Sequence, residues 1–281
     1  MNAYIALFIT LILFSTIEVA VKLLGNVIDP ILLASLRFFV AGLIMLPFCK
    51  IDFKKFRKRE ILGIFFCAAV GIAGCFIPYH KGVFLMPASS AALIFCLNPI
   101  FAVIAARVLV HEKFSQKIFI GLFLGIFGVY ISTIGFTLPD FSDYSLGSLL
   151  LLISAITFGI YTAASKKLIA KYSSLTITAL VFTLGGIMML PFVQNWTIPT
   201  DARSMSIIAY LVFVATVVGY LCFFYALKRV SVAAGSSLFF LKPIIAAIFS
   251  FIILRENLTP LFFAGMVICL LSLFIILRKK N

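Results

Sequence analysis

The feature that most constrains this chain is a succession of long apolar runs separated by short polar connections. A helix needs about 20 apolar residues to cross the hydrocarbon core of a bilayer. The runs are too long for the roughly 10-residue alternating strands of an outer-membrane barrel. With 64% hydrophobic and 11% charged residues, the chain also has too little polar surface to cover a water-facing globule. The sequence therefore predicts an all-α integral membrane protein and excludes a soluble enzyme or DNA-binding protein.

The apolar runs predict ten transmembrane helices. Pairs such as Asp29-Pro30 and Thr259-Pro260 set boundaries, because proline cannot continue a preceding helix. The predicted spans are residues 3–24, 30–48, 61–82, 87–109, 117–136, 146–166, 174–194, 205–226, 232–254 and 259–277.

The basic residues are distributed unevenly between the two sides of these spans. The formal net charge of +14 invites a nucleic-acid partner, but the lysines and arginines lie between apolar runs rather than on one element. Most of the 23 lysines and arginines fall in connections on the same side as both termini. The positive-inside rule predicts a multi-pass protein of the cell (inner, cytoplasmic) membrane with both termini cytoplasmic. The lipid bilayer is then an expected partner, and nucleic acid is not.

The two halves of the sequence match at a constant spacing of 144 residues. Met45-Leu46-Pro47-Phe48 pairs with Met189-Leu190-Pro191-Phe192, and Asn98-Pro99 pairs with Lys242-Pro243. Shared leucines can arise by chance between apolar helices, but shared prolines, glycines and charges at one spacing favour a duplication. Each predicted copy, 1–137 and 138–281, holds five spans. An odd number inverts the second copy, so we expect two inverted five-helix repeats, an architecture typical of secondary transporters.

Several segments of the chain resemble those of a known family. They are the paired segments AGLIMLPF and GGIMMLPF, the dipeptide Arg37-Phe38, and the regions ASSAALIFCLNPIFAVIAARVLVHEKF and VAAGSSLFFLKPIIAAIFSFIILRENL. The sequence resembles the drug/metabolite transporter superfamily, in particular its EamA-type ten-span members. The resemblance implies a secondary transporter, often an exporter, of amino acids or other small metabolites. Glu18 and Lys242 depart from the family's pattern.

Charges within a membrane are costly, so Glu18 and Arg37 are candidate site residues. Glu18 lies one turn from Lys22, so Lys22 can neutralise it while snorkelling to the surface. Alternatively, Glu18 binds a proton or a cationic group, as a first-span glutamate does in the related small multidrug resistance family. For Arg37, a structural ion pair with Glu18 is the favoured interpretation.

The pairs Asn98-Pro99 and Lys242-Pro243 fall near the middle of their spans. Proline frees a carbonyl one turn earlier, and a broken helix in a membrane must face protein or a water-filled cavity. A simple kink is the alternative. We expect a cavity in which Lys242 meets a substrate carboxylate and Asn98 supplies orienting hydrogen bonds.

Other polar side chains can complete a substrate site. His80 is either an interfacial residue at a helix end or a vestibule residue that shuttles protons. Tyr79, Tyr161 and Tyr220 carry hydroxyls that can line a cavity for an amphipathic substrate. Glu112 is expected to cap the helix that follows it or to pair with local basic residues, with a gating contact as the alternative.

These observations leave several functions open. The favoured one is export of a small metabolite by alternating access, with or without proton coupling. The alternative is proton-coupled efflux of multidrug or cationic compounds through Glu18. A membrane-embedded enzyme is disfavoured because HExxH, GxSxG and phosphate-loop motifs are missing from the sequence, and a non-transporting sensor would leave the repeat unexplained. No cofactor or metal is expected, and the protein can be a monomer or a homodimer.

Overall fold

The structure is a computed structural model of the chain that describes residues 2–25, 27–49, 51, 56–85, 94–133, 145–254 and 260–277. These residues form helices and connections, and none of them lies in a β-strand. Six helical stretches among them are long and apolar enough to cross a membrane, and four shorter apolar helices accompany them. The six are Ala3–Val21, Pro30–Phe48, Lys58–Val83, Leu146–Lys171, Ser174–Phe192 and Ala202–Leu227. The prediction of an all-helical, multi-pass membrane protein is therefore confirmed.

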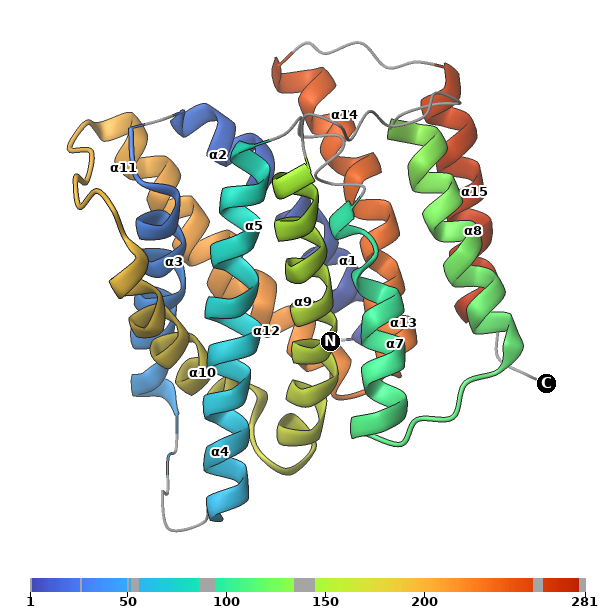
Figure 1. Cartoon of the computed structure of the whole chain (residues 1–281), viewed down its shortest axis with the longest axis horizontal. Helices are drawn as coiled ribbons and strands as arrows, with labels where there is room; N and C mark the ends of the chain where they lie inside the picture. The colour runs from blue at the N-terminus through green and yellow to red at the C-terminus, as the bar shows by residue number, and fades with distance from the viewer. Residues whose placement is uncertain are drawn as a thin grey trace.

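The helices of the two halves lie side by side (Figure 1). The first half contains α1 (Ala3–Ser15), α2 (Ile17–Leu24), α3 (Pro30–Met45), α4 (Lys58–Phe66), α5 (Gly74–Phe84), α7 (Asn98–Leu109) and α8 (Gln116–Thr133). The second half contains α9 (Ser145–Lys171), α10 (Ser174–Met189), α11 (Ala202–Ala209), α12 (Gly219–Leu227), α13 (Val232–Ser237), α14 (Lys242–Leu254) and α15 (Pro260–Leu277). Helices α8 and α15 pack as a pair at the right-hand edge of the view (Figure 1).

Helix bounds of the first half recur in the second half 144 residues later. Helices α3 and α10 begin and end at positions related by this spacing, and so do α8 and α15. Each half also contains one π-helical segment, Cys67–Ala73 between α4 and α5 and Tyr210–Val218 between α11 and α12. Below, residues 144 apart are called equivalent positions.

Several predicted spans are interrupted rather than continuous, among them the first and the ninth. The first breaks at Thr16, whose hydroxyl donates to the carbonyl of Leu13 at 2.7 Å and bonds the Tyr210 hydroxyl at 2.6 Å. Such a side chain competes with the backbone for helical hydrogen bonds. The ninth breaks between Ser237 and Lys242, where a 3-10 turn precedes α14. Pro243 is the second residue of α14. A proline is accommodated in the first turn of a helix, where its missing N–H would have no helical partner, so the helix restarts at this point.

The backbones of the two halves approach closely where α3 crosses α10. A side chain at Gly42 would lie 2.5 Å from the backbone nitrogen of Thr183, and one at Gly186 would lie 2.6 Å from that of Phe39. Small residues allow membrane helices to approach this closely. The contact is reciprocal, because Gly42 and Gly186 are equivalent positions and so are Phe39 and Thr183.

Aromatic side chains fill the space beside this crossing. The rings of Phe38 and Phe182, which are equivalent positions, meet edge to face with centroids 4.9 Å apart. Phe38 also packs 4.5 Å from Phe76, and Phe182 packs 4.9 Å from Tyr220. The result is an aromatic core built from both halves, next to the helix breaks described below.

Candidate functional site

Asn98 begins α7 at a break caused by proline. Pro99 has no N–H, so the carbonyl of Phe95 loses its helical donor, and the Asn98 amide nitrogen donates to that carbonyl at 2.8 Å. Asn98 is fully buried, and its Oδ1 has no hydrogen-bond partner among the described residues. A buried acceptor left unpaired costs about 1–3 kcal/mol. Asn98 therefore presents an acceptor suited to a donor supplied by a ligand.

Lys242 occupies the equivalent position at the start of α14. Its ammonium nitrogen lies 5.7 Å from the centre of the Phe95 ring, within the range of a cation–π contact. The side chain is half-buried, while Asn98 is not exposed at all. The carbonyl of Lys242 accepts from the Ser15 hydroxyl at 3.3 Å, which joins the broken helix to α1. Both prolines thus place a polar residue against Phe95.

Tyr79 reaches the same aromatic ring from α5, and His80 packs against Tyr79. Tyr79 packs 4.9 Å from Phe95 and 5.4 Å from His80, in edge-to-face arrangements. Phe158 of α9 lies 5.5 Å from Phe95 on another side. Three of the predicted site residues, Lys242, Asn98 and Tyr79, therefore contact Phe95, and His80 adjoins them through Tyr79.

His80 is not exposed to solvent. His80 is 4% exposed, and its Nδ1 lies 2.8 Å from the carbonyl oxygen of Phe76 within α5. Pro78 frees the carbonyl of Gly74, which accepts from the Thr157 hydroxyl at 3.3 Å. The helix continues through Pro78 because its lost hydrogen bond is replaced by one from α9.

Tyr161 and Tyr220 lie deeper, in the aromatic core. They are 1% and 3% exposed, and both contact Phe224, at 5.6 and 6.1 Å between ring centroids. Phe158 connects them to the Phe95 group, because its ring lies 6.2 Å from that of Tyr161. In this conformation both tyrosines are core residues that adjoin the site.

Arg37 is buried at 1% exposure, on the face of α3 that meets the second π-helical segment. Its Nε donates to the Thr216 hydroxyl at 3.3 Å, and that hydroxyl donates to the carbonyl of Leu211 at 2.7 Å. Wider π-helical turns occur often at functional sites. Sequence reasoning missed Thr216, because nothing in its neighbourhood marks a π-helix.

The side chains of Glu18 and Lys22 lie outside the described residues, as does Glu256. The pairing of Glu18 with Lys22 or Arg37, and its role in proton or cation binding, stay predictions.

Glu112 has partners that differ from the expected local ones. Its carboxylate lies 2.7 Å from the Lys166 nitrogen of α9 and accepts the backbone N–H of Val232, the first residue of α13, at 3.0 Å. Lys166 also donates to the carbonyl of Val230. The described contacts of this carboxylate are to α9 and the start of α13 rather than to α8, the helix that follows it. The three groups tie the connection after α7 to α9 and α13.

The EamA-like transporter family matches residues 1–134 and again residues 145–278. The chain belongs to this family. The EamA assignment made from the sequence is therefore confirmed, and the protein is a transporter rather than an enzyme.

Several relatives have names that describe transport. An Archaeoglobus fulgidus protein named "Uncharacterized transporter" is 26% identical over the full length of both chains. A "Probable terminal-alkyne amino-acid exporter" of Streptantibioticus cattleyicolor is 25% identical and covers 79% of this chain and 75% of its own. A "Riboflavin transporter ImpX" of Fusobacterium nucleatum is 26% identical over 79% of this chain and 78% of its own. A solved crystal structure at 16% identity shares the fold, with a TM-score of 0.80 over 97% of this chain and 95% of that one.

Proposed function

We propose that this EamA transporter exports a small metabolite that carries both a carboxylate and a hydrogen-bond donor, such as an amino acid, by alternating access. The observation that carries the proposal is the meeting of Lys242 and Asn98 at Phe95. The relative named as an amino-acid exporter supports both the substrate class and the direction.

The two side chains offer complementary chemistry to such a substrate. The Lys242 ammonium attracts the carboxylate, since a charge-assisted hydrogen bond is stronger than a neutral one. The unpaired Oδ1 of Asn98 accepts from the substrate's ammonium or hydroxyl group. Tyr79 and Phe158, which flank Phe95, contact the apolar part of the substrate.

The architecture we propose is ten spans in two inverted five-helix repeats, 1–137 and 138–281, in the cell membrane with cytoplasmic termini. Its support is the recurrence of helix bounds, the reciprocal glycine contacts between α3 and α10, and the two separate matches to one family. The breaks at equivalent prolines support a site between the repeats, which is where inverted-repeat transporters bind their substrates.

Alternating access requires contacts on each side that form and break. We assign this role on the side of the termini to the Glu112 carboxylate with Lys166 and Val232. The side chains of both charged partners are only 16% exposed, so water screens the pair weakly. Opening on this side would separate the connection after α7 from α9 and α13.

Exchange measured in proteoliposomes tests the proposal. The substrate panel contains apolar amino acids, their methyl esters, the matching amines and riboflavin. We expect exchange of the free amino acids and little exchange of the esters, which lack the carboxylate. Lys242→Met should reduce amino-acid exchange at least about tenfold, equivalent to roughly 1.4 kcal/mol. Lys242→Arg keeps the charge and should retain more activity than Lys242→Met.

Two results would contradict the substrate assignment. One is equal exchange of amino acids and their esters, and the other is full activity of folded Lys242→Met. Exchange of riboflavin alone would keep the chain a transporter and remove the amino-acid class.

A further inference from the structure

We propose that the groove between α7 and α8 and the basic cavity below it form a binding site for one anionic phospholipid. The groove would hold an acyl chain, and the cavity would hold the phosphate of the headgroup. This inference does not depend on the identity of the transported substrate.

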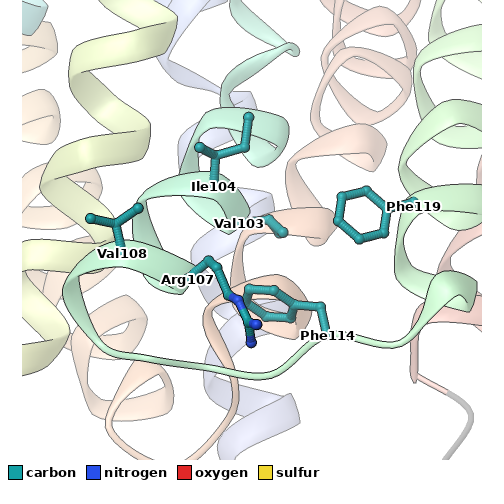
Figure 2. Close-up of a pocket in the computed structure, with 6 residues that line it drawn as sticks. All are labelled: Val103, Ile104, Arg107, Val108, Phe114 and Phe119. Atoms are coloured by element: carbon teal, nitrogen blue, oxygen red, sulfur yellow. The ribbon is translucent and has the colours of Figure 1, made fainter.

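The groove is a cavity of about 330 Å³ whose lining is apolar apart from Arg107 (Figure 2). Val103 forms part of its floor and is 1% exposed, while Ile104, Val108 and Phe119 are 53%, 66% and 57% exposed. Apolar side chains this exposed on a membrane helix face lipid chains. The groove therefore opens sideways into hydrocarbon and suits an acyl chain.

The second cavity, of about 440 Å³, lies beside the connection that follows α7. Four cationic side chains line it, Lys113, Lys166, Lys228 and Arg229, and Glu112 supplies the one carboxylate among its described lining residues. Since Glu112 pairs with Lys166, no carboxylate in that described lining balances the charges of the other three. This cavity is suited to an anion.

Two of these cations already make hydrogen bonds, but to neutral groups. Lys228 donates to the carbonyl of Tyr172 at 3.2 Å, and Arg229 donates to that of Tyr225 at 2.8 Å. A carbonyl positions a cation without neutralising it. Lysine and arginine held in this way suit a phosphate, which arginine can bind with two parallel hydrogen bonds.

Phe114 connects the two cavities because it lines both of them. Figure 2 shows its ring at the lower edge of the groove, next to the Arg107 side chain that points down from α7. An apolar groove that ends in a cluster of cations matches a phospholipid better than it matches a free phosphate, because a free phosphate has no apolar part to fill the groove. Basic pockets between helices on the cytoplasmic side of membrane proteins are recognised binding sites for anionic headgroups.

The site includes elements of both halves. Helices α7 and α8 form the groove, while Lys166 of α9 and the turn between α12 and α13 provide the other wall of the cation cluster. A bound lipid would hold these elements together on the side where Glu112 joins them.

Lipid binding to the purified full-length chain tests the site. The probes are phosphatidylglycerol and phosphatidylcholine with identical acyl chains, measured by native mass spectrometry and by the shift in melting temperature. We expect phosphatidylglycerol to bind at least about tenfold more tightly, since each basic residue near the headgroup contributes roughly a factor of five and several line the cavity. Equal binding of the two lipids by the parent protein would overturn the proposal without any variant.

Charge variants locate the site. The triple variant Lys113→Gln, Lys228→Gln and Arg229→Gln should lose the preference for phosphatidylglycerol. The matched control Arg57→Gln, Lys58→Gln and Arg59→Gln removes three exposed basic residues at the start of α4, outside both cavities, and should keep the preference. An equal loss in both variants would mean nonspecific attraction and would reject the site.

A groove variant separates a lipid from a free anion. Val108→Trp should weaken binding of long-chain phosphatidylglycerol and leave binding of its dihexanoyl form unchanged. Displacement of long-chain phosphatidylglycerol by an equal concentration of inorganic phosphate would identify a simple anion site instead.

Discussion

The two halves of the molecule share a frame and differ in its polar residues. Helix bounds, the π-helical segments and many aromatic contacts recur at equivalent positions. For example, Tyr79 packs 5.4 Å from His80 in the first half, and Phe223 packs 5.2 Å from Phe224 at the equivalent positions. The frame is common to both halves, so chemistry specific to this chain has to come from the positions where they differ.

Three of those differences fall at predicted site residues. Lys242 stands where the first half has Asn98, and Arg37 stands where the second half has Val181. His80 corresponds to Phe224. A shared frame with an asymmetric set of polar groups allows two similar bundles to move about one site that itself has a single preferred substrate orientation.

The largest expected effect tests the shared frame. Gly186→Ala should destabilise the protein by about 1–3 kcal/mol, because the new Cβ would meet backbone atoms of Phe39 that no rotamer change can move. Gly42→Ala should cost a similar amount, because its Cβ would meet the backbone of Thr183. Thermal unfolding in detergent measures both.

Gly63→Ala is the matched control for this pair. Its Cβ would lie 3.3 Å from a terminal methyl group of Leu168, which can shift at little cost. A large difference between Gly42→Ala and Gly186→Ala would show that the two halves do not share the crossing equally, and would weaken the comparison.

The next effect tests a difference between the halves. Thr216→Val should destabilise the protein by about 1–3 kcal/mol, because it removes a hydroxyl acceptor from the buried Arg37 guanidinium. Thr216→Ser keeps the hydroxyl and should lose much less stability. The positions equivalent to Arg37 and Thr216 are Val181 and Ile72, whose apolar side chains cannot form a comparable hydrogen bond. If Thr216→Val melts at the parent temperature, the hydrogen bond to Arg37 contributes nothing.

A smaller effect concerns the first turns of α3 and α10. Asp29 accepts the N–H groups of Ile31 and Leu32 at 2.8 and 3.0 Å, whereas the equivalent Ser173 makes no capping hydrogen bond with its side chain. Asp29→Ala should therefore cost about 1 kcal/mol, and Ser173→Ala close to nothing. Equal melting shifts for these two variants would contradict the difference in capping.

Much of the frame follows from the sequence. Apolar runs predict helices because each buried or lipid-facing helix needs a continuous apolar stretch, and the repeated Met-Leu-Pro-Phe motif marks the ends of α3 and α10. Pro243 indicates an irregularity at Lys242. The sequence predicts a kink or a cavity wall there, whereas in the structure a new helix begins at this residue. The helix break at Thr16 could not be predicted from the local sequence, because the Thr16 side chain bonds Tyr210, which lies nearly two hundred residues away.

The candidate site could be predicted only in part. Lys242 and Asn98 stood out because polar residues before proline are rare in apolar spans. Phe95, which they both contact, is one of 32 phenylalanines and has no distinguishing neighbour. Glu112 was conspicuous as a charge, but its partners Lys166 and Val232 lie in the other half, and only tertiary structure brings them together.

The smallest expected effect is a pH dependence at the start of α11. The Ser204 N–H donates to the Asp201 carboxylate at 2.9 Å, and this hydrogen bond lowers the pKa of Asp201 from its usual value near 3.8. A carboxyl with a lowered pKa in the folded state stabilises the protein above the unfolded pKa and loses that contribution as pH falls through the folded one. Asp201→Asn keeps a capping oxygen but cannot ionise, so its melting temperature should fall less than the parent's between pH 5 and pH 3.

The first half begins α4 differently, because Glu60 accepts the backbone N–H of Arg57 at 2.9 Å. Asp201→Asn should leave the acid response of Glu60 intact. If parent and variant lose stability in parallel over this range, the Ser204 hydrogen bond does not favour the ionised carboxylate, and the difference between the two helix starts has no energetic consequence.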